Sequence, residues 1–130
     1  MTDRELINEA IEASRHAYAP YSKRRVGAAL ECDDGTVVLG CTVENADLGV
    51  SMCAEQSAVC GAVARGRTDF RRIAIYSKES SDYLTPCGTC RQILSEFSPE
   101  MEVLCVRSDG RYVSYKLRHL LPAAPGRDRY

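Results

Sequence analysis

The chain contains seven cysteines, and three of them stand in two segments whose residue types could bind a metal ion. One segment reads C-A-E over residues 53–55, and the other reads P-C-G-T-C over residues 86–90. Catalytic zinc sites use three protein ligands, with Zn–S bonds of ~2.3 Å, and leave the fourth position open for water. Cys53, Cys87 and Cys90 are therefore the predicted zinc ligands.

Glu55 follows Cys53 by two residues, at the start of the same predicted helix. Its carboxylate could lie beside the open zinc position without binding the metal. Zinc activates water for attack, and a neighbouring carboxylate can move the protons that the reaction releases and consumes. Three cysteine ligands with such an acid form the signature of the zinc-dependent deaminases. Glu55 is therefore the predicted catalytic residue, although alone it would be taken for a solvated helix-start glutamate.

A structural zinc site is the main alternative, and it requires four protein ligands. Cys60 follows Cys53 by two helical turns, ~10 Å at 1.5 Å per residue, which is too far to join. The remaining cysteines lie in predicted strands and are expected to be core residues: Cys32, Cys41 and Cys105. The catalytic interpretation is therefore favoured.

Periodicity and turn residues predict the elements that must position these side chains. Helices are expected over residues 3–18, 54–65, 88–97 and 116–121, and strands over 26–32, 36–44, 72–77, 101–106 and 112–115. This order favours an α/β protein, with one mixed sheet and helices on both faces. Two of the helices begin at Cys53 and Cys87, where the helix dipole stabilises a thiolate.

Length and composition exclude several classes of protein. With 130 residues, the sequence predicts a single domain over 1–130, in which 123–130 form a flexible tail. The formal net charge of −1 gives no general attraction for nucleic acids or anionic membranes. No uncharged stretch, including 56–64, is longer than nine residues, so no membrane span is expected. The N-terminus lacks the apolar segment of a secretory signal, so we expect a reducing, cytoplasmic location without disulfides.

The two cysteine segments resemble those of the cytidine deaminases in their short, zinc-dependent form. Further segments match the family in order, so that the likeness covers most of residues 3–122; they lie at 21–23, 26–30, 43–46, 90–92 and 120–122. The resemblance implies a three-layer α/β/α sandwich around a mixed five-stranded sheet. It also implies deamination of cytidine or deoxycytidine to the uridine form, and a homotetramer whose neighbouring subunits complete each site.

The resemblance further implies roles for individual residues around the base and the sugar. The Ala54 N–H would hold the ring carbonyl, the Thr85 carbonyl would accept from the amino group, and Glu44 would hold the sugar 3′-hydroxyl. Because Arg91 directly follows Cys90, it is a candidate donor to a thiolate, although a plain salt bridge is an equal alternative.

Several positions depart from the family pattern. Arg24 stands where the family has a phenylalanine beside the base, and Thr42 stands where it often has an asparagine near the sugar. Leu48, Pro125 and Gln56 replace a tyrosine, a phenylalanine and an arginine. These changes leave the predicted metal set intact, so they favour a retained reaction. Beside cytidine or deoxycytidine, the first hypothesis, they raise a second one, in which the substrate is a cytosine nucleoside antibiotic of the blasticidin-S kind or another modified nucleoside. A non-catalytic zinc module that binds a partner is the third hypothesis.

Overall fold

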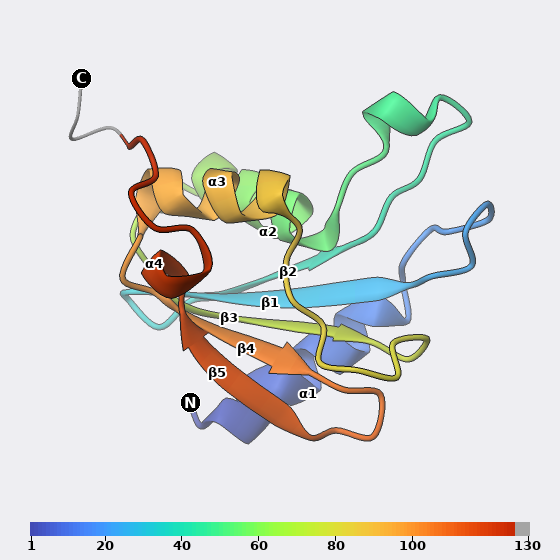
Figure 1. The fold of residues 1–130 in the computed structure, drawn as a ribbon, viewed down its shortest axis with the longest axis horizontal. Helices are drawn as coiled ribbons and strands as arrows, with labels where there is room; N and C mark the ends of the chain where they lie inside the picture. Colours follow the sequence, from blue (N-terminus) through green and yellow to red (C-terminus); the bar gives the residue numbers. More distant parts are fainter. Residues whose placement is uncertain (127–130) are drawn as a thin grey trace.

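The computed structural model describes residues 1–126, in which five strands form one mixed sheet with helices on both faces (Figure 1). The strand order is β2-β1-β3-β4-β5. The elements are α1 (Asp3–Ser14), β1 (Val26–Cys32), β2 (Val37–Cys41), η1 (Leu48–Val50), α2 (Ala54–Ala64), β3 (Phe70–Ser77), α3 (Gly88–Phe97), β4 (Glu102–Val106), β5 (Tyr112–Lys116) and α4 (Leu117–Leu120). The predicted three-layer α/β/α sandwich is confirmed.

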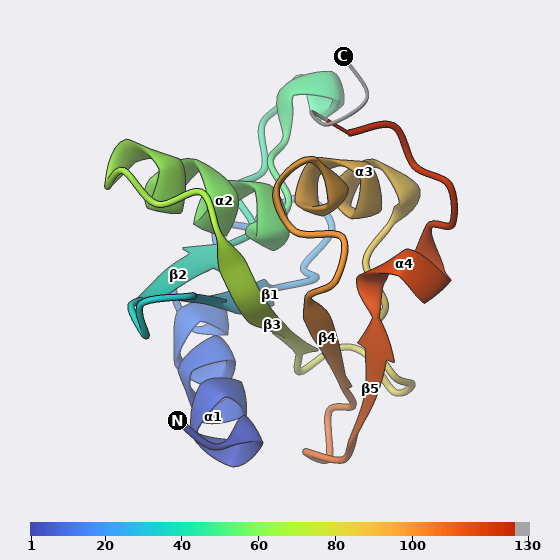
Figure 2. The same ribbon diagram turned by 90° about the vertical axis from the view of Figure 1, so that its left-hand side faces the viewer.

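The connections between strands decide which face each helix covers. Strands β3 and β4 pair in parallel, whereas the other neighbouring strands pair antiparallel. A parallel pair needs a crossover connection, and α3 supplies it between β3 and β4. Figure 2 shows α1 on one face of the sheet and α2 with α3 on the other. The two helices that begin at predicted zinc ligands therefore share one face.

Both faces of the central strands are buried, because side chains alternate across a strand. Ala28 and Leu30 of β1 belong to the core cluster under α2 and α3, whereas Ala29 belongs to the cluster under α1. Cys32 and Cys105 are buried in the first of these clusters, which confirms them as core residues. The same prediction was wrong for Cys41, which is only half-buried at the end of the edge strand β2. The face that carries the cysteine segments is thus supported by a continuous apolar layer.

The first helix is shorter than the periodicity predicts, ending at Ser14 instead of residue 18. Tyr18 instead pairs with the chain after β2: its N–H donates to the Thr42 carbonyl at 2.8 Å, and the Glu44 N–H donates to the Tyr18 carbonyl at 2.8 Å. This pairing is long-range, so local periodicity could not reveal it. It holds the segment before β1 against residues 42–44, where the two form a wall of the candidate site.

The expected tail over 123–130 lies partly outside the described residues. Within the described part, the Pro125 carbonyl accepts a hydrogen bond of 3.0 Å from the Gln92 side chain on α3. Through residue 126, no helix combines the length and the apolar character that crossing a membrane requires.

Candidate active site and metal centre

The three predicted zinc ligands lie together. The Sγ atoms of Cys53, Cys87 and Cys90 all lie within 4.8 Å of one another, and those of Cys87 and Cys90 are 3.5 Å apart. Tetrahedral coordination with Zn–S bonds of ~2.3 Å would separate two sulfurs by roughly 3.8 Å. The donor set and its spacing therefore fit a zinc ion held by three thiolates.

Two helix N-termini create this cluster. Cys53 is the N-cap of α2, Cys87 is the N-cap of α3, and Cys90 lies in the first turn of α3. The side chain of Gln56 accepts a hydrogen bond of 2.9 Å from the Cys53 N–H, which fixes the start of α2. Each helix N-terminus favours negative charge, so both helices help to offset the charge of the thiolates.

The cysteine sulfurs of the cluster influence one another's pKa values through hydrogen bonds. The pKa of the Cys53 thiol is lowered to about 7, chiefly because the Cys90 thiol donates a hydrogen bond to its sulfur. The same contact, together with burial, raises the pKa of the Cys90 thiol. Closely spaced groups of one charge oppose each other's ionisation, and a bound divalent cation removes that conflict. The protein thus brings together sulfurs whose full ionisation calls for a cation.

Glu55 lies beside the cysteines and is withdrawn from water. It is 5% exposed, in the first turn of α2. Burial raises the pKa of the Glu55 carboxyl, and hydrogen bonds with its own backbone N–H and with Cys90 oppose that rise only in part. A carboxyl with a raised pKa takes up a proton more readily than an exposed carboxyl does, which suits the base of a proton shuttle.

A pocket of about 470 Å³ opens onto this cluster. Cys53, Ala54, Glu55 and Cys87 line it, together with Thr85 from the loop before α3. Ala54 is fully buried, and its N–H heads α2, where the helix itself supplies no acceptor. The structure thus brings to one cavity the groups predicted to hold the base and to react with it.

The predicted sugar-side residues line the same pocket but are already hydrogen-bonded within the protein. Glu44 accepts from the backbone N–H groups of Tyr21 and Ser22, at 3.0 and 3.1 Å, and from the Ser22 hydroxyl at 2.5 Å. The Thr42 hydroxyl accepts from the Val26 N–H at 3.1 Å. Their roles toward a sugar stay predictions, since both groups also fasten the segment before β1.

The sequence analysis did not single out some of the residues that line the pocket. Ser22, Met52 and Leu84 line the cavity. Ser22 stands within a segment that resembles the family, which was the only available signal. Met52 and Leu84 are apolar loop residues whose sequence context marks no chemistry. By contrast, Leu48 is 73% exposed on η1, and it is not among the pocket-lining residues.

The guanidinium of Arg91 binds backbone carbonyls. Its Nε donates to the Pro86 carbonyl at 2.7 Å, and its Nη1 donates to the Leu120 carbonyl at 2.9 Å. These bonds tie the residue before Cys87 to α4. A donor role toward a thiolate stays a prediction, whereas the bond to Pro86 makes Arg91 a positioning residue for the loop that carries Cys87.

Gly40 lets α2 approach the sheet closely enough to place its cysteine. A Cβ atom at Gly40 would lie 2.3 Å from the Ala54 carbonyl oxygen and 2.5 Å from the Ala58 N. We expect Gly40→Ala to push α2 outward, to destabilise the fold by about 1–3 kcal/mol and to weaken zinc binding about tenfold, as displaced support of a ligand does. Urea denaturation and zinc competition with a chelator measure the two effects.

Gly27→Ala is the matched control, since its Cβ would meet α1 on the opposite face, 2.1 Å from the Ala10 carbonyl oxygen. That variant should lose stability while keeping its zinc affinity. Equal losses of zinc affinity in both variants would contradict the positioning role of Gly40.

Comparisons with known proteins agree with this geometry. The sequence model of the cytidine and deoxycytidylate deaminase zinc-binding region matches residues 1–106. A cytidine deaminase of Halalkalibacterium halodurans is 40% identical over 120 residues, covering 92% of this chain and 90% of the relative. The crystal structure of a cytidine deaminase from Burkholderia pseudomallei superimposes with a TM-score of 0.92 and 41% identity, covering 96% of this chain and all of the other.

A more distant relative, a blasticidin-S deaminase of Bacillus cereus, is 31% identical over 127 residues, which cover 92% of this chain and 89% of the relative. The zinc-binding family model covers α2 and α3, the two helices whose N-termini carry the cysteine cluster. The chain therefore belongs to the zinc-dependent cytidine and deoxycytidylate deaminase family.

Proposed function

We propose that this protein hydrolyses a cytosine nucleoside, cytidine or deoxycytidine, to the corresponding uridine and ammonia. The observation that carries the proposal is the buried Glu55 carboxyl beside three cysteine sulfurs at a pocket of about 470 Å³. Relatives that bear the name cytidine deaminase match nearly the whole chain. A zinc module without catalysis would not need a buried proton carrier at an open cavity.

Different residues of the pocket have different roles in the reaction. Cys53, Cys87 and Cys90 would hold the zinc ion, which would supply the Lewis acidity needed to activate water. The Glu55 carboxylate takes one proton from the attacking water and delivers it to the ring nitrogen. It then takes the second proton from the hydroxyl that has added to the ring carbon and passes it to the amino group, which leaves as ammonia while the carbonyl forms. One carboxylate thus serves first as base and then as acid.

Backbone groups on either side of the metal cluster orient the ring. We assign the Ala54 N–H to the ring carbonyl and the Thr85 carbonyl to the amino group, because both residues line the pocket. A backbone group at the end of a packed helix is held in place before substrate arrives, which lowers the entropic cost of orientation. Glu44 and Thr42 are assigned to the sugar side.

Turnover with and without metal tests the function. Zinc-loaded protein should convert cytidine or deoxycytidine with one ammonia released for each uridine formed. Dialysis against a strong chelator should abolish turnover, and added zinc should restore it. Absorbance of the pyrimidine and an ammonia assay follow the reaction. If zinc-loaded protein turns over neither cytidine nor deoxycytidine, and 5-substituted cytidines and cytosine antibiotics are inert as well, the proposed function is wrong.

A deaminase of a cytosine nucleoside antibiotic is the second candidate. Arg24 favours it, because this residue lines the pocket where the family has an aromatic side chain. Blasticidin S in the same assay distinguishes the candidates: higher kcat/KM for the antibiotic than for cytidine would favour the second.

The same family membership supports three broader proposals: a homotetramer, a cytoplasmic location and a role in pyrimidine salvage. The loop after β2 exposes several apolar side chains, which a neighbouring subunit could cover: Val43, Leu48, Val50 and Met52. All seven cysteines are free, as suits a reducing compartment. Light scattering during size-exclusion chromatography should give four times the 14.4 kDa of one chain.

A further inference from the structure

The segment between β3 and α3, residues 78–87, forms one edge of the substrate pocket. Leu84, Thr85, Pro86 and Cys87 all line the pocket. Figure 1 shows the segment, in yellow, passing the end of β4 on its way to α3. Within residues 1–126, Thr85 takes part in no hydrogen bond. Its carbonyl, assigned to the amino group of the base, is therefore placed by the contacts of the residues on either side of it.

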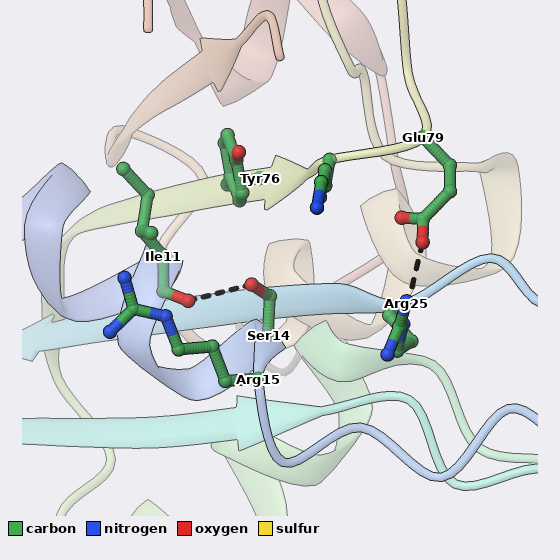
Figure 3. Close-up of a pocket in the computed structure, with 7 residues that line it drawn as sticks. Ile11, Ser14, Arg15, Arg25, Tyr76 and Glu79 are labelled. Carbon is green, nitrogen blue, oxygen red and sulfur yellow. Dashed lines mark hydrogen bonds and ion pairs between the residues drawn. The ribbon is translucent and has the colours of Figure 1, made fainter.

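The start of the segment is fixed outside this pocket. Glu79 accepts from the Ser77 hydroxyl at 3.1 Å and from Arg25 Nε at 3.4 Å. Figure 3 shows the Arg25–Glu79 pair at a separate cavity of about 300 Å³, which Ile11 and Tyr76 also line. With side chains 53% and 30% exposed, this pair is open to water and contributes little to stability. It fixes the first residues of the segment and does not reach the pocket edge.

The middle of the segment runs beside the end of β4. The Ser108 N–H donates to the Ser80 carbonyl at 3.0 Å, and the Leu84 N–H donates to the Val106 carbonyl at 3.4 Å. The second bond is longer than the usual range of about 2.7–3.2 Å, so it holds Leu84 only weakly. Tyr83 and Leu84 also pack against the core cluster under α2 and α3.

Arg107, between Val106 and Ser108 in the chain, lies over the ring of Tyr83. The Cζ atom of its guanidinium is 5.5 Å from the ring centroid. Its Nη2 pairs with Asp109 at 3.1 Å, whereas its Nε is buried and has no hydrogen-bond partner in the part of the chain that the structure describes. A cation over an aromatic face is attracted more strongly where water is excluded. The ring therefore supplies the interaction that the buried side of this guanidinium otherwise lacks.

From these contacts we propose that Arg107, acting through Tyr83, is a positioning residue for the pocket edge at Thr85. The inference rests on the proposed function, in which the Thr85 carbonyl binds the amino group of the base. Without the Arg107 contact, the Tyr83 side chain is held by apolar packing alone, and the segment spends part of its time displaced. Substrate then binds only the fraction of molecules with Thr85 in place, so KM rises in proportion.

The other side of Thr85 has a separate support. Arg91 Nε donates to the Pro86 carbonyl at 2.7 Å, and α3 begins directly after Cys87, its N-cap. These contacts do not involve Arg107, so loss of the stacking contact should leave the zinc ligands in place. We therefore expect Arg107 to affect substrate binding and not the metal centre.

The test measures zinc content and steady-state kinetics of zinc-loaded protein with cytidine, or with the cytosine nucleoside that the wild type turns over fastest. Arg107→Met should raise KM by about 5- to 30-fold, the size expected for a water-excluded cation–π contact, and should leave kcat within about threefold of wild type. Tyr83→Leu should raise KM equally, and the double variant should raise it no further, because both changes remove one contact. Zinc content should stay unchanged in all three variants.

Conservative variants and a surface variant supply the controls. Tyr83→Phe keeps an aromatic face, so its KM should stay within about twofold of wild type, and Arg107→Lys should keep part of the wild-type affinity. Arg25→Gln removes the exposed ion pair at the start of the segment and should also leave KM within about twofold. A merely structural role would lower the fraction of active protein, and with it the apparent kcat, while KM stayed unchanged.

An unchanged KM in Arg107→Met or in Tyr83→Leu overturns the inference. A double variant whose rise in KM is the product of the two single rises overturns it as well, because the two side chains would then act separately. Turnover by the wild type with no change of KM in the variants defeats only this inference. No turnover of any cytosine nucleoside by zinc-loaded wild type defeats the proposed function, on which the inference rests.

Discussion

Replacing Glu55 with glutamine lowers kcat for a cytosine nucleoside by about 10²–10⁴-fold, the usual contribution of a positioned proton carrier. Glutamine has nearly the same size, so the side chain stays buried at the start of α2. It cannot take up a proton and return it, so both proton transfers lose their carrier. The three cysteines are untouched, so zinc content should remain at one per chain. Steady-state kinetics and elemental analysis of the same preparation measure both.

The control is Glu96→Gln, an equal charge change at an exposed position of α3. That variant should keep wild-type turnover. Full activity of Glu55→Gln would rule out the assigned mechanism, and loss of zinc from it would make Glu55 a support of the metal site. A non-catalytic zinc module, the alternative hypothesis, predicts no turnover in the wild type either.

The second large effect concerns stability. Arg72→Met should destabilise the protein by about 3–5 kcal/mol, because it leaves a buried carboxylate without its partner. Glu31 is 1% exposed and accepts from Arg72 Nε at 2.7 Å and from Nη2 at 3.0 Å. Arg72 also donates to Asp3 at 2.6 Å and to the Met1 carbonyl at 2.6 Å, so it anchors the start of α1 to β1 and β3. Its guanidinium holds the pKa of the Glu31 carboxyl below its ordinary range.

An exposed pair of similar length supplies the control. Arg118 and Glu100 are 2.8 Å apart, with side chains 54% and 63% exposed, so Arg118→Met should cost no more than about 1 kcal/mol. The double variant Glu31→Met/Arg72→Met should recover much of the loss, because two apolar side chains can replace a buried ion pair. Urea denaturation measures all three variants. A cost below 1 kcal/mol for Arg72→Met would show that water reaches Glu31 freely.

Local sequence predicted those parts of the site that lie within one element. Cys87 and Cys90 are three residues apart at a helix start, and α3 begins and ends where it was expected, at Gly88 and Phe97. The first strand was also predicted with its observed bounds, Val26–Cys32. Helical and strand periods are properties of neighbouring residues, so short-range patterns carry them.

Only the tertiary structure decided how Cys53 joins the other two cysteines. The sheet order and the close contact at Gly40 set the start of α2 beside the start of α3, and neither follows from local pattern. In the same way, only folding brings the carbonyls of Pro86 and Leu120 to the guanidinium of Arg91, while its donor role toward a thiolate stays a prediction. A long side chain binds the acceptors that folding brings to it.

The pocket wall formed by the segment before β1 also combines features that the sequence predicted with features that only the structure decided. The sequence marked Arg24 through its position in the family pattern, but the basic run of residues 23–25 did not reveal which way the side chains of Arg24 and Arg25 point. Long-range contacts fix the backbone of this segment: Tyr18 pairs with the chain after β2, and Ser22 donates to Glu44. With the backbone held in this way, Arg24 lines the substrate pocket and Arg25 contacts Glu79. Residue types thus determined which metal and which reaction the protein supports. Contacts between distant segments decided which charges face the ligand, because those contacts alone set where each side chain points.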